Sequence, residues 1–155
     1  MTDRRDRVAD IGFRLLNLGH KTVFRATGGR FPRSLRGMAA VELRTVGRVS
    51  GQVRTTMLAS PLNDEKRVVL VASKYGDDRD PQWYRNLLVN PDVEVVIHGE
   101  TRALRARKAT AEEKGVLWPS IVTAYKNYDA YQRKSSRDIP VVICEARPGR
   151  VGPAC

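Results

Sequence analysis

Alternating apolar and polar positions, together with runs of β-branched residues, place most of the strands in this chain. Both patterns are typical of half-buried strands. They predict six strands, at residues 39–45, 55–62, 67–73, 93–99, a segment through Thr101, Leu104 and Ala106, and 139–146. Asn63-Asp64 and His98-Gly99-Glu100 favour turns between consecutive strands.

Helical spacing and helix-boundary residues predict the remaining elements. Apolar side chains from Val8 to Leu18 recur on one side with polar residues opposite, which indicates an amphipathic helix. Proline starts a second helix over Pro81–Val89, and Thr110 is a helix N-cap ahead of two glutamates. A third helical patch covers Tyr125–Lys134.

Strands that follow one another through short turns, with helices inserted late, favour a mainly β fold with helices, of the α+β class. The order predicts an antiparallel sheet closed into a barrel and covered by helices. The barrel spans residues 36–146 as one domain, after an N-terminal helix and arm at 1–35. Residues 147–155, rich in proline and glycine, form a loose tail.

The charge of the chain changes the list of partners. Lysine and arginine number 28 against 17 acids in 155 residues, for a net charge of +11. The first 36 residues hold nine of the bases and three of the acids. Such a field concentrates anionic partners, which leaves nucleic acid, anionic lipid and a polyanionic small molecule as candidates.

Other site classes find little support. Cys144 lies in an apolar strand and Cys155 ends the chain, so a structural disulfide is not expected and the compartment is reducing and cytoplasmic. His20 and His98 lack clustered ligands, so no metal site is expected. No apolar run reaches bilayer length, and no hydrolase constellation is present.

The segment Gly47–Arg54 carries the clearest candidate chemistry. It sits between two predicted strands and contains two glycines, a serine and two arginines, in the order Gly-Arg-Val-Ser-Gly-Gln-Val-Arg. Glycine allows close approach of the backbone to a ligand, and arginine grips phosphate or carboxylate through two hydrogen bonds. The segment therefore favours an anion clamp, and a tight turn with solvated arginines is the alternative.

Four blocks together resemble the deazaflavin-dependent nitroreductase family, whose members reduce quinones and nitro compounds. These are Thr45–Arg54, Val71–Lys74, Pro81–Leu87 with Asn90-Pro91, and Ile139–Val142, and the resemblance covers residues 41–145. It implies a split β-barrel of the type that binds flavin mononucleotide. It also implies use of reduced coenzyme F(420), an 8-hydroxy-5-deazaflavin with a phosphodiester and an oligoglutamate tail.

The same resemblance assigns residues. It places the cofactor's phosphate and tail at Arg48, Ser50, Gly51 and Arg54, its ring beside Met57, Ala72, Ser73 and Lys74, and gives Asn86 a cofactor-side role. Two positions depart from the family pattern. Val49 stands where many relatives carry a second basic residue, and Ala59 where several carry an aromatic one. These changes remove one charge contact and open the acceptor side of the pocket.

Tyr125, Tyr128 and Tyr131 recur every three residues and share one face of the predicted helix. By spacing alone a packed aromatic face explains them, whereas the resemblance makes them the lining of the acceptor pocket. Their hydroxyls, with that of Ser73, would orient the acceptor and donate to an oxygen that gains charge as hydride arrives.

The sequence therefore predicts an oxidoreductase that transfers hydride from reduced coenzyme F(420) to a quinone or nitroaromatic acceptor. The alternatives are a split barrel that binds flavin mono- or dinucleotide and, with less support, a basic nucleic-acid-binding protein, although no nucleic-acid recognition element is evident. Residues 1–35 are expected either to pack on the barrel or to rest on the anionic inner face of the cell membrane.

Overall fold

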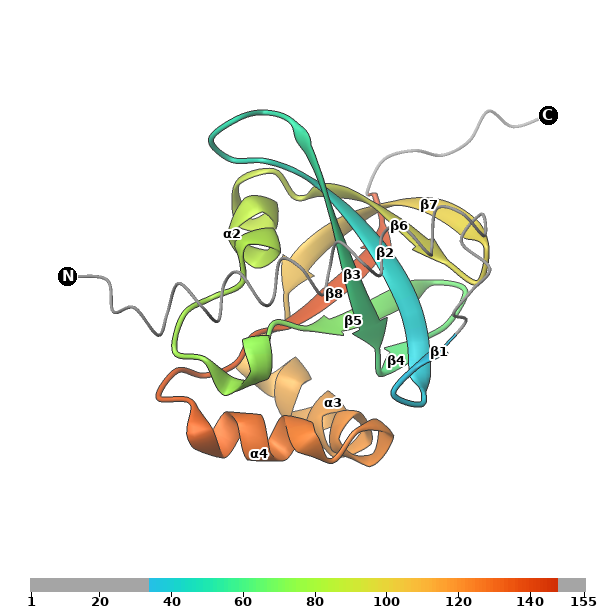
Figure 1. Cartoon of the computed structure of the whole chain (residues 1–155). Helices are drawn as coiled ribbons and strands as arrows, with labels where there is room; N and C mark the ends of the chain where they lie inside the picture. Colours follow the sequence, from blue (N-terminus) through green and yellow to red (C-terminus); the bar gives the residue numbers. More distant parts are fainter. Residues whose placement is uncertain (1–33, 148–155) are drawn as a thin grey trace.

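The computed structural model describes residues 34–147, in which one antiparallel sheet is partly enclosed by three α-helices (Figure 1). The strands are β1 (Ser34–Leu35), β2 (Met38–Val46), β3 (Val53–Ser60), β4 (Leu62–Asn63), β5 (Arg67–Val71), β6 (Asp92–Ile97), β7 (Glu100–Lys108) and β8 (Val141–Ala146). The helices are the 3-10 helix η1 (Lys74–Gly76) and the α-helices α2 (Gln82–Val89), α3 (Ala111–Ala124) and α4 (Asn127–Lys134). The predicted N-terminal helix and loose tail lie outside the described residues.

The sheet nearly closes on itself. Its order is β1-β2-β6-β7-β8-β5-β4, with β3 paired to the other side of β2, and every pairing is antiparallel. The end of β3 lies against β5. The Ser60 hydroxyl there is within hydrogen-bonding distance of the carbonyl oxygens of Leu62 and Val69, at 2.8 Å each. This topology confirms the predicted antiparallel α+β fold.

All six predicted strands are present, with shifted ends and two short additions. Pro61 divides the predicted strand 55–62 into β3 and β4, because proline has no N–H to donate to a neighbouring strand. Pro140 likewise delays β8 until Val141. The pair Ser34–Leu35 joins β2, so the sheet includes the last two residues of the predicted arm.

Two apolar clusters fill the fold. One lies between the inner face of the sheet and α2 and includes Leu43, Leu70 and Leu87, each at most 1% exposed. The other packs α3 and α4 against β5 and β8 around Ile121 and Ile139. Figure 1 shows α2 at one end of the sheet and the α3–α4 pair along another side. Within residues 34–147, no helix is long and apolar enough to cross a membrane.

The helix boundaries test the capping predictions. Thr110 is the N-cap of α3, as predicted: its hydroxyl accepts from the Glu113 amide at 3.1 Å, and the Glu113 carboxylate accepts from the Thr110 amide at 2.8 Å. The predicted helix from Tyr125 is wrong at its start. Tyr125 is extended, with φ −154°, and terminates α3, so α4 begins only at Asn127.

The loop after β5 is held from two sides. The Arg137 guanidinium, 14% exposed, donates to the carbonyl oxygens of Ala72, Ser73 and Asp77 and to the Asp80 carboxylate, all within 3.0 Å. On the other side, Gly76 adopts φ +80° directly against α4. The loop is therefore fixed relative to both α4 and the end of β5.

Gly76→Ala is expected to lower the free energy of unfolding by about 2 kcal/mol or more, because φ +80° disfavours a side chain and overpacking adds strain. The new Cβ would lie 2.9 Å from the Tyr131 carbonyl oxygen. The measurement is urea denaturation followed by circular dichroism.

Gly115→Ala is the matched control. Gly115 lies within α3 with open space where its Cβ would stand. This variant is expected to gain about 0.5–1 kcal/mol from helix propensity. Equal stabilities for the two variants would contradict the assigned packing of the loop on α4.

Candidate functional site

The β2–β3 turn is a tight glycine-dependent loop. The Gly47 amide donates to the Gln52 carbonyl at 2.8 Å, and the Gly51 amide donates to the Gly47 carbonyl at 2.9 Å. Gly51 has φ +68°, and a Cβ on Gly47 would lie 2.7 Å from Ser50 Oγ. Both glycines therefore allow the tight turn at this position, and the predicted close approach of the backbone to a ligand stays a prediction.

Asn86 of α2 holds Arg48 in place. Its side-chain oxygen accepts from the Arg48 amide at 3.2 Å and from Arg48 Nη1 at 2.9 Å, while its nitrogen donates to Thr45 Oγ1 at 3.4 Å. Asn86 is 6% exposed, so these contacts occupy most of its polar surface. The structure thus places Asn86 beneath a predicted cofactor-binding arginine.

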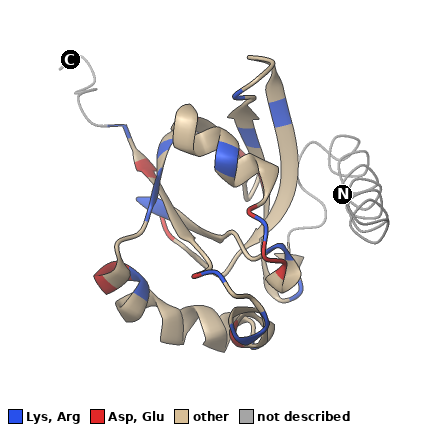
Figure 2. Cartoon of the chain, turned by 90° about the vertical axis from the view of Figure 1, so that its left-hand side faces the viewer, with Lys and Arg blue, Asp and Glu red and all other residues tan. Residues whose placement is uncertain are grey.

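Arg54 lies across the same turn. Its Nη2 donates to Ser50 Oγ at 3.3 Å, and Ser50 Oγ also accepts from the Gln52 amide at 3.2 Å. Within residues 34–147, neither Arg48 nor Arg54 has a carboxylate partner. Figure 2 shows basic residues on both this hairpin and α2. Two guanidinium groups are thus available to an anion.

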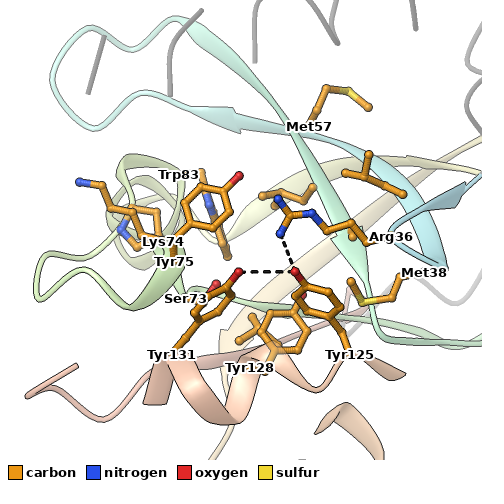
Figure 3. Close-up of a pocket in the computed structure, with 15 residues that line it drawn as sticks. Arg36, Met38, Met57, Ser73, Lys74, Tyr75, Trp83, Tyr125, Tyr128 and Tyr131 are labelled. Carbon is orange, nitrogen blue, oxygen red and sulfur yellow. Dashed lines mark hydrogen bonds between the residues drawn. The ribbon is translucent and has the colours of Figure 1, made fainter. Parts of the chain in front are cut away.

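A pocket opens farther along β3, with a volume of about 130 Å³. Its wall combines apolar, aromatic and polar side chains from four parts of the chain (Figure 3). The lining residues are Leu35, Arg36, Met38, Met57, Leu58, Ala59, Val71, Ser73, Lys74, Tyr75, Pro81, Trp83, Tyr125, Tyr128 and Tyr131. We call this cavity the tyrosine pocket. Its mostly apolar wall with a few polar groups suits a planar organic ligand.

Three tyrosine rings from the α3–α4 junction pack together in the tyrosine pocket. The ring centroids of Tyr125 and Tyr128 are 5.2 Å apart, and those of Tyr128 and Tyr131 are 6.2 Å apart. Tyr128 is only 6% exposed. The Tyr125 and Tyr131 hydroxyls lie 3.5 Å from each other. Burial raises the pKa of Tyr128 well above its usual range. Tyr125 and Tyr131 therefore present the more accessible hydroxyls.

The loop after β5 supplies the opposite wall. Ser73, Lys74 and Tyr75 line the pocket, and the last two adopt positive φ values of 44° and 57°. Lys74 Nζ lies 3.9 Å from the Asp77 carboxylate. It also lines a polar groove with Arg79, Asp80, Gln82 and Arg85. Lys74 thus stands between the tyrosine pocket and a second, largely basic surface.

The structure brings together most of the predicted site residues, in two groups. Met57, Ser73, Lys74 and the three tyrosines line one pocket, while Arg48, Ser50, Gly51, Arg54 and Asn86 gather at the β2–β3 turn. Ala72 is fully buried in the core and takes no part in the pocket lining. Val49 is 91% exposed, and Ala59 lines the pocket as predicted from its small size.

Sequence reasoning missed Arg36, Tyr75 and Asn127. The Arg36 guanidinium donates to the Tyr125 hydroxyl at 2.9 Å, and Asn127 Nδ2 donates to the same oxygen at 2.7 Å. The only signal for Arg36 was the Arg36-Gly37 pair ahead of β2, a two-residue turn in sequence. Trp83 is 4% exposed in the core and also contributes to the pocket wall.

The donor set fits a long anionic cofactor with a planar end. Arg54 and Met57 lie on the same strand three residues apart, which spans about 10 Å. Basic side chains therefore lie at one end of β3, and the apolar and aromatic wall of the tyrosine pocket lies farther along it. Within residues 34–147, no three side chains of His, Cys, Asp or Glu gather as a metal site would require.

Comparison with known proteins identifies relatives with the same architecture. The model of the F420H(2)-dependent quinone reductase family matches residues 18–146. The F420H(2)-dependent quinone reductase of Mycobacterium tuberculosis is 36% identical over 141 residues, covering 88% of this chain and 93% of that protein.

Two solved structures agree. An F420-H2 dependent reductase, FDR-A, superposes with a TM-score of 0.63 at 36% identity, covering 68% of this chain and 93% of that one. A chain described as a domain-swapped dimer has a TM-score of 0.66 at 32% identity and covers 92% of this chain and all of its own.

These similarities confirm the predicted split barrel and the resemblance on which the site residues were assigned. They favour the deazaflavin interpretation over the flavin and nucleic-acid alternatives, because the matched descriptions name a deazaflavin donor. The match covers the described sheet, helices and both groups of site residues. The chain belongs to the F420H(2)-dependent quinone reductase family.

Proposed function

We propose that this protein binds reduced coenzyme F(420) and transfers hydride from it to a quinone. The observation that carries the proposal is the layout along β3: the β2–β3 turn holds two arginines that lack acidic partners among residues 34–147, and the tyrosine pocket lies farther along the strand. Family membership supplies the identity of the donor. Nitroaromatic compounds, which are also planar and gain negative charge on oxygen, are proposed as further acceptors.

The residues at the β2–β3 turn would bind the anionic part of the cofactor. Arg48 and Arg54 offer planar guanidinium forks to phosphate or carboxylate oxygens. Asn86 orients Arg48 through two hydrogen bonds, so less side-chain entropy is lost when the anion binds. Lys74, at the edge of the polar groove, adds positive charge between the two ends.

The tyrosine pocket would align the acceptor. The coenzyme supplies the hydride and both electrons, so the chain needs only to orient the acceptor, exclude water and stabilise charge on its oxygen. Met57, Leu58 and Trp83 provide apolar contact, which excludes water. The hydroxyls of Ser73, Tyr125 and Tyr131 face the same cavity, where they can donate to an oxygen as it becomes negative.

We also propose, from the sequence pattern, that the N-terminal segment ahead of β1 rests on an anionic membrane surface. Its basic, amphipathic pattern supports this role, which would bring the pocket close to lipid-soluble quinones. Co-sedimentation with vesicles of anionic and of neutral lipid tests it. Equal pelleting with both vesicle types would contradict a charge-driven contact.

Arg48→Ala and Arg54→Ala are each expected to weaken binding of coenzyme F(420) by about tenfold, since a charge-assisted hydrogen bond contributes on the order of 1.5–3 kcal/mol. Fluorescence titration of the coenzyme measures the effect. Raising the salt concentration should weaken coenzyme binding by the parent more than binding by either variant, because each variant has lost one of the ionic contacts that salt screens.

Arg67→Ala serves as the matched control, because it removes the same charge at the β4–β5 turn, where Arg67 pairs with Asp64 at 3.6 Å. Its affinity should stay within about twofold of the parent, which is a few tenths of a kcal/mol. Similar losses of affinity in all three variants would indicate that the overall positive charge attracts the coenzyme, rather than specific contacts at the β2–β3 turn.

Ala59→Tyr is expected to narrow the tyrosine pocket on its acceptor side, because Ala59 lines it. We expect KM for a naphthoquinone with a branched ring substituent to rise about tenfold, with little change for the unsubstituted compound. Ala103→Tyr, on an exposed position of β7, is the control. An equal rise in KM for both quinones would show that Ala59 does not line the acceptor side of the pocket.

A further inference from the structure

Arg36 occupies a strained position at the edge of the tyrosine pocket. Leu35 pairs with Met38, so Arg36 and Gly37 form a two-residue turn between β1 and β2, with φ values of +56° and +79°. Asparagine or glycine is the usual first residue of such a turn, and a bulkier side chain costs about 1–2 kcal/mol there. An arginine at this position suggests that its side chain has a use elsewhere.

The Arg36 side chain reaches from this turn into the group of tyrosines (Figure 3). Its guanidinium carbon lies 5.3 Å from the centroid of the Tyr75 ring and 5.5 Å from that of Tyr125. Its Nη1 donates to the Tyr125 hydroxyl at 2.9 Å. Within residues 34–147 no carboxylate pairs with Arg36. Its charge therefore acts mainly on phenols.

The hydrogen bonds around Tyr125 determine what its hydroxyl can do. A neutral phenol accepts about two hydrogen bonds and donates one. Arg36 Nη1 and Asn127 Nδ2 both donate to the Tyr125 oxygen, at 2.9 and 2.7 Å, so its accepting positions are filled. The capacity that remains is the O–H itself, which can be directed at Tyr131, 3.5 Å away, or at a ligand in the pocket.

We propose that Arg36 is a positioning residue that makes Tyr125 the proton donor to the acceptor oxygen. The proposal rests on the proposed function, because the acceptor is the quinone of that reaction. Tyr131 and Tyr128 contact Tyr125 but receive no hydrogen bond from Asn127, and Tyr128 is nearly buried. Arg36 also interacts with Tyr131, so the combination of donors from Arg36 and Asn127 is what distinguishes Tyr125 from its two neighbours of the same chemistry.

The proton and electrons balance as follows. The hydride brings two electrons to the quinone, and one quinone oxygen then carries a negative charge. The Tyr125 O–H bond breaks, a new O–H bond forms on that oxygen, and the electron pair stays on the Tyr125 oxygen. Arg36 and Asn127 hold the resulting tyrosinate, which later takes a proton from water. The coenzyme, after giving up hydride, would release one proton to water, which balances the proton that the tyrosinate takes up, and the products would be the hydroquinone and the oxidised deazaflavin.

The surroundings of Tyr125 agree with this role. Partial burial opposes its ionisation, but the hydrogen bond shared with Tyr131, the one that Asn127 donates and the charge of Arg36 outweigh burial, so the pKa of Tyr125 is lowered. Burial and the bond to Tyr125 raise the pKa of Tyr131. The other charged or titratable groups that face the pocket are Lys74 and Tyr75 from the β5–α2 loop and Tyr128 from α4.

Arg36→Asn tests the proposal without weakening the hairpin, because Asn-Gly is the preferred pair for this turn. Arg36→Lys keeps a cation, and Tyr125→Phe removes the phenol. The first measurement is ultraviolet titration of tyrosinate in the ligand-free full chain, which holds five tyrosines. In the parent we expect one tyrosine to ionise below the usual pKa of about 10.

Arg36→Asn should move that ionisation up by about one pH unit, Arg36→Lys should restore part of the shift, and Tyr125→Phe should abolish it. Urea denaturation should show Arg36→Asn to be at least as stable as the parent. An unchanged tyrosine titration in Arg36→Asn, or a low ionisation that survives in Tyr125→Phe, would overturn the pairing of these two residues.

The second measurement is the pH dependence of quinone reduction at saturating donor. The parent rate should fall as pH rises through the ionisation of Tyr125. In Arg36→Asn this fall should occur at higher pH. Tyr125→Phe should be slower by about a hundredfold, and its rate should not show this fall. If the titration shifts but the rate profile does not, Tyr125 is not the donor. A parent with no quinone reduction would instead refute the proposed function, whatever the titration shows.

Discussion

The hydrogen bonds that Arg137 donates to the loop after β5 are the constraint on which the rest of the site depends. One side chain, 14% exposed, bonds three backbone carbonyls and a carboxylate between Ala72 and Asp80. Removing such a group would leave the carbonyl of the fully buried Ala72 and three partly buried acceptors unpaired, which costs more than the bonds contribute. The loop must therefore stay where α4 and Arg137 hold it, and with it Ser73, Lys74 and Tyr75. The two walls of the tyrosine pocket come from segments more than 45 residues apart, yet this contact gives them one fixed separation.

A fixed separation matters because the chain supplies no covalent chemistry. Its proposed task is to hold two flat molecules in register and to control one proton, so errors in position affect the rate directly. The β2–β3 turn meets this need differently. There Asn86 is the buried support of the partly buried Arg48, whereas the exposed Arg54 makes only a longer bond to Ser50, at 3.3 Å. Rigidity near the reacting atoms and adaptable charge at the anionic end suit a cofactor whose ring must be placed more accurately than its tail.

Local patterns predicted the parts of the site that depend on neighbouring residues in sequence. The glycine turn with its arginines, the Thr110 cap and the strands around Met57 are of this kind. The predictions that failed needed tertiary information. Tyr125 fits a helix by spacing, but its backbone is extended where α3 meets α4. Asn86 could be assigned a ligand, although its place beneath Arg48 follows only from the packing of α2 beside the β2–β3 hairpin. The Arg36-Gly37 pair indicates only a turn, and nothing in the sequence assigns the Arg36 side chain a partner, because its contact with Tyr125 spans 89 positions.

Residues with strained backbone are concentrated at the tyrosine pocket, which indicates that the pocket, rather than the stability of the fold, requires them. Among residues 34–147, four non-glycine residues have positive φ, namely Arg36, Lys74, Tyr75 and His98. His98 stands in an ordinary two-residue hairpin turn between β6 and β7, where its ring forms a hydrogen bond with the exposed Asn63. The other three all line the tyrosine pocket. A turn that needed only to connect β1 and β2 would gain stability from asparagine at position 36. The strain at Arg36 is therefore best explained by what its guanidinium does to Tyr125, and the same argument extends to Lys74 and Tyr75 on the opposite wall.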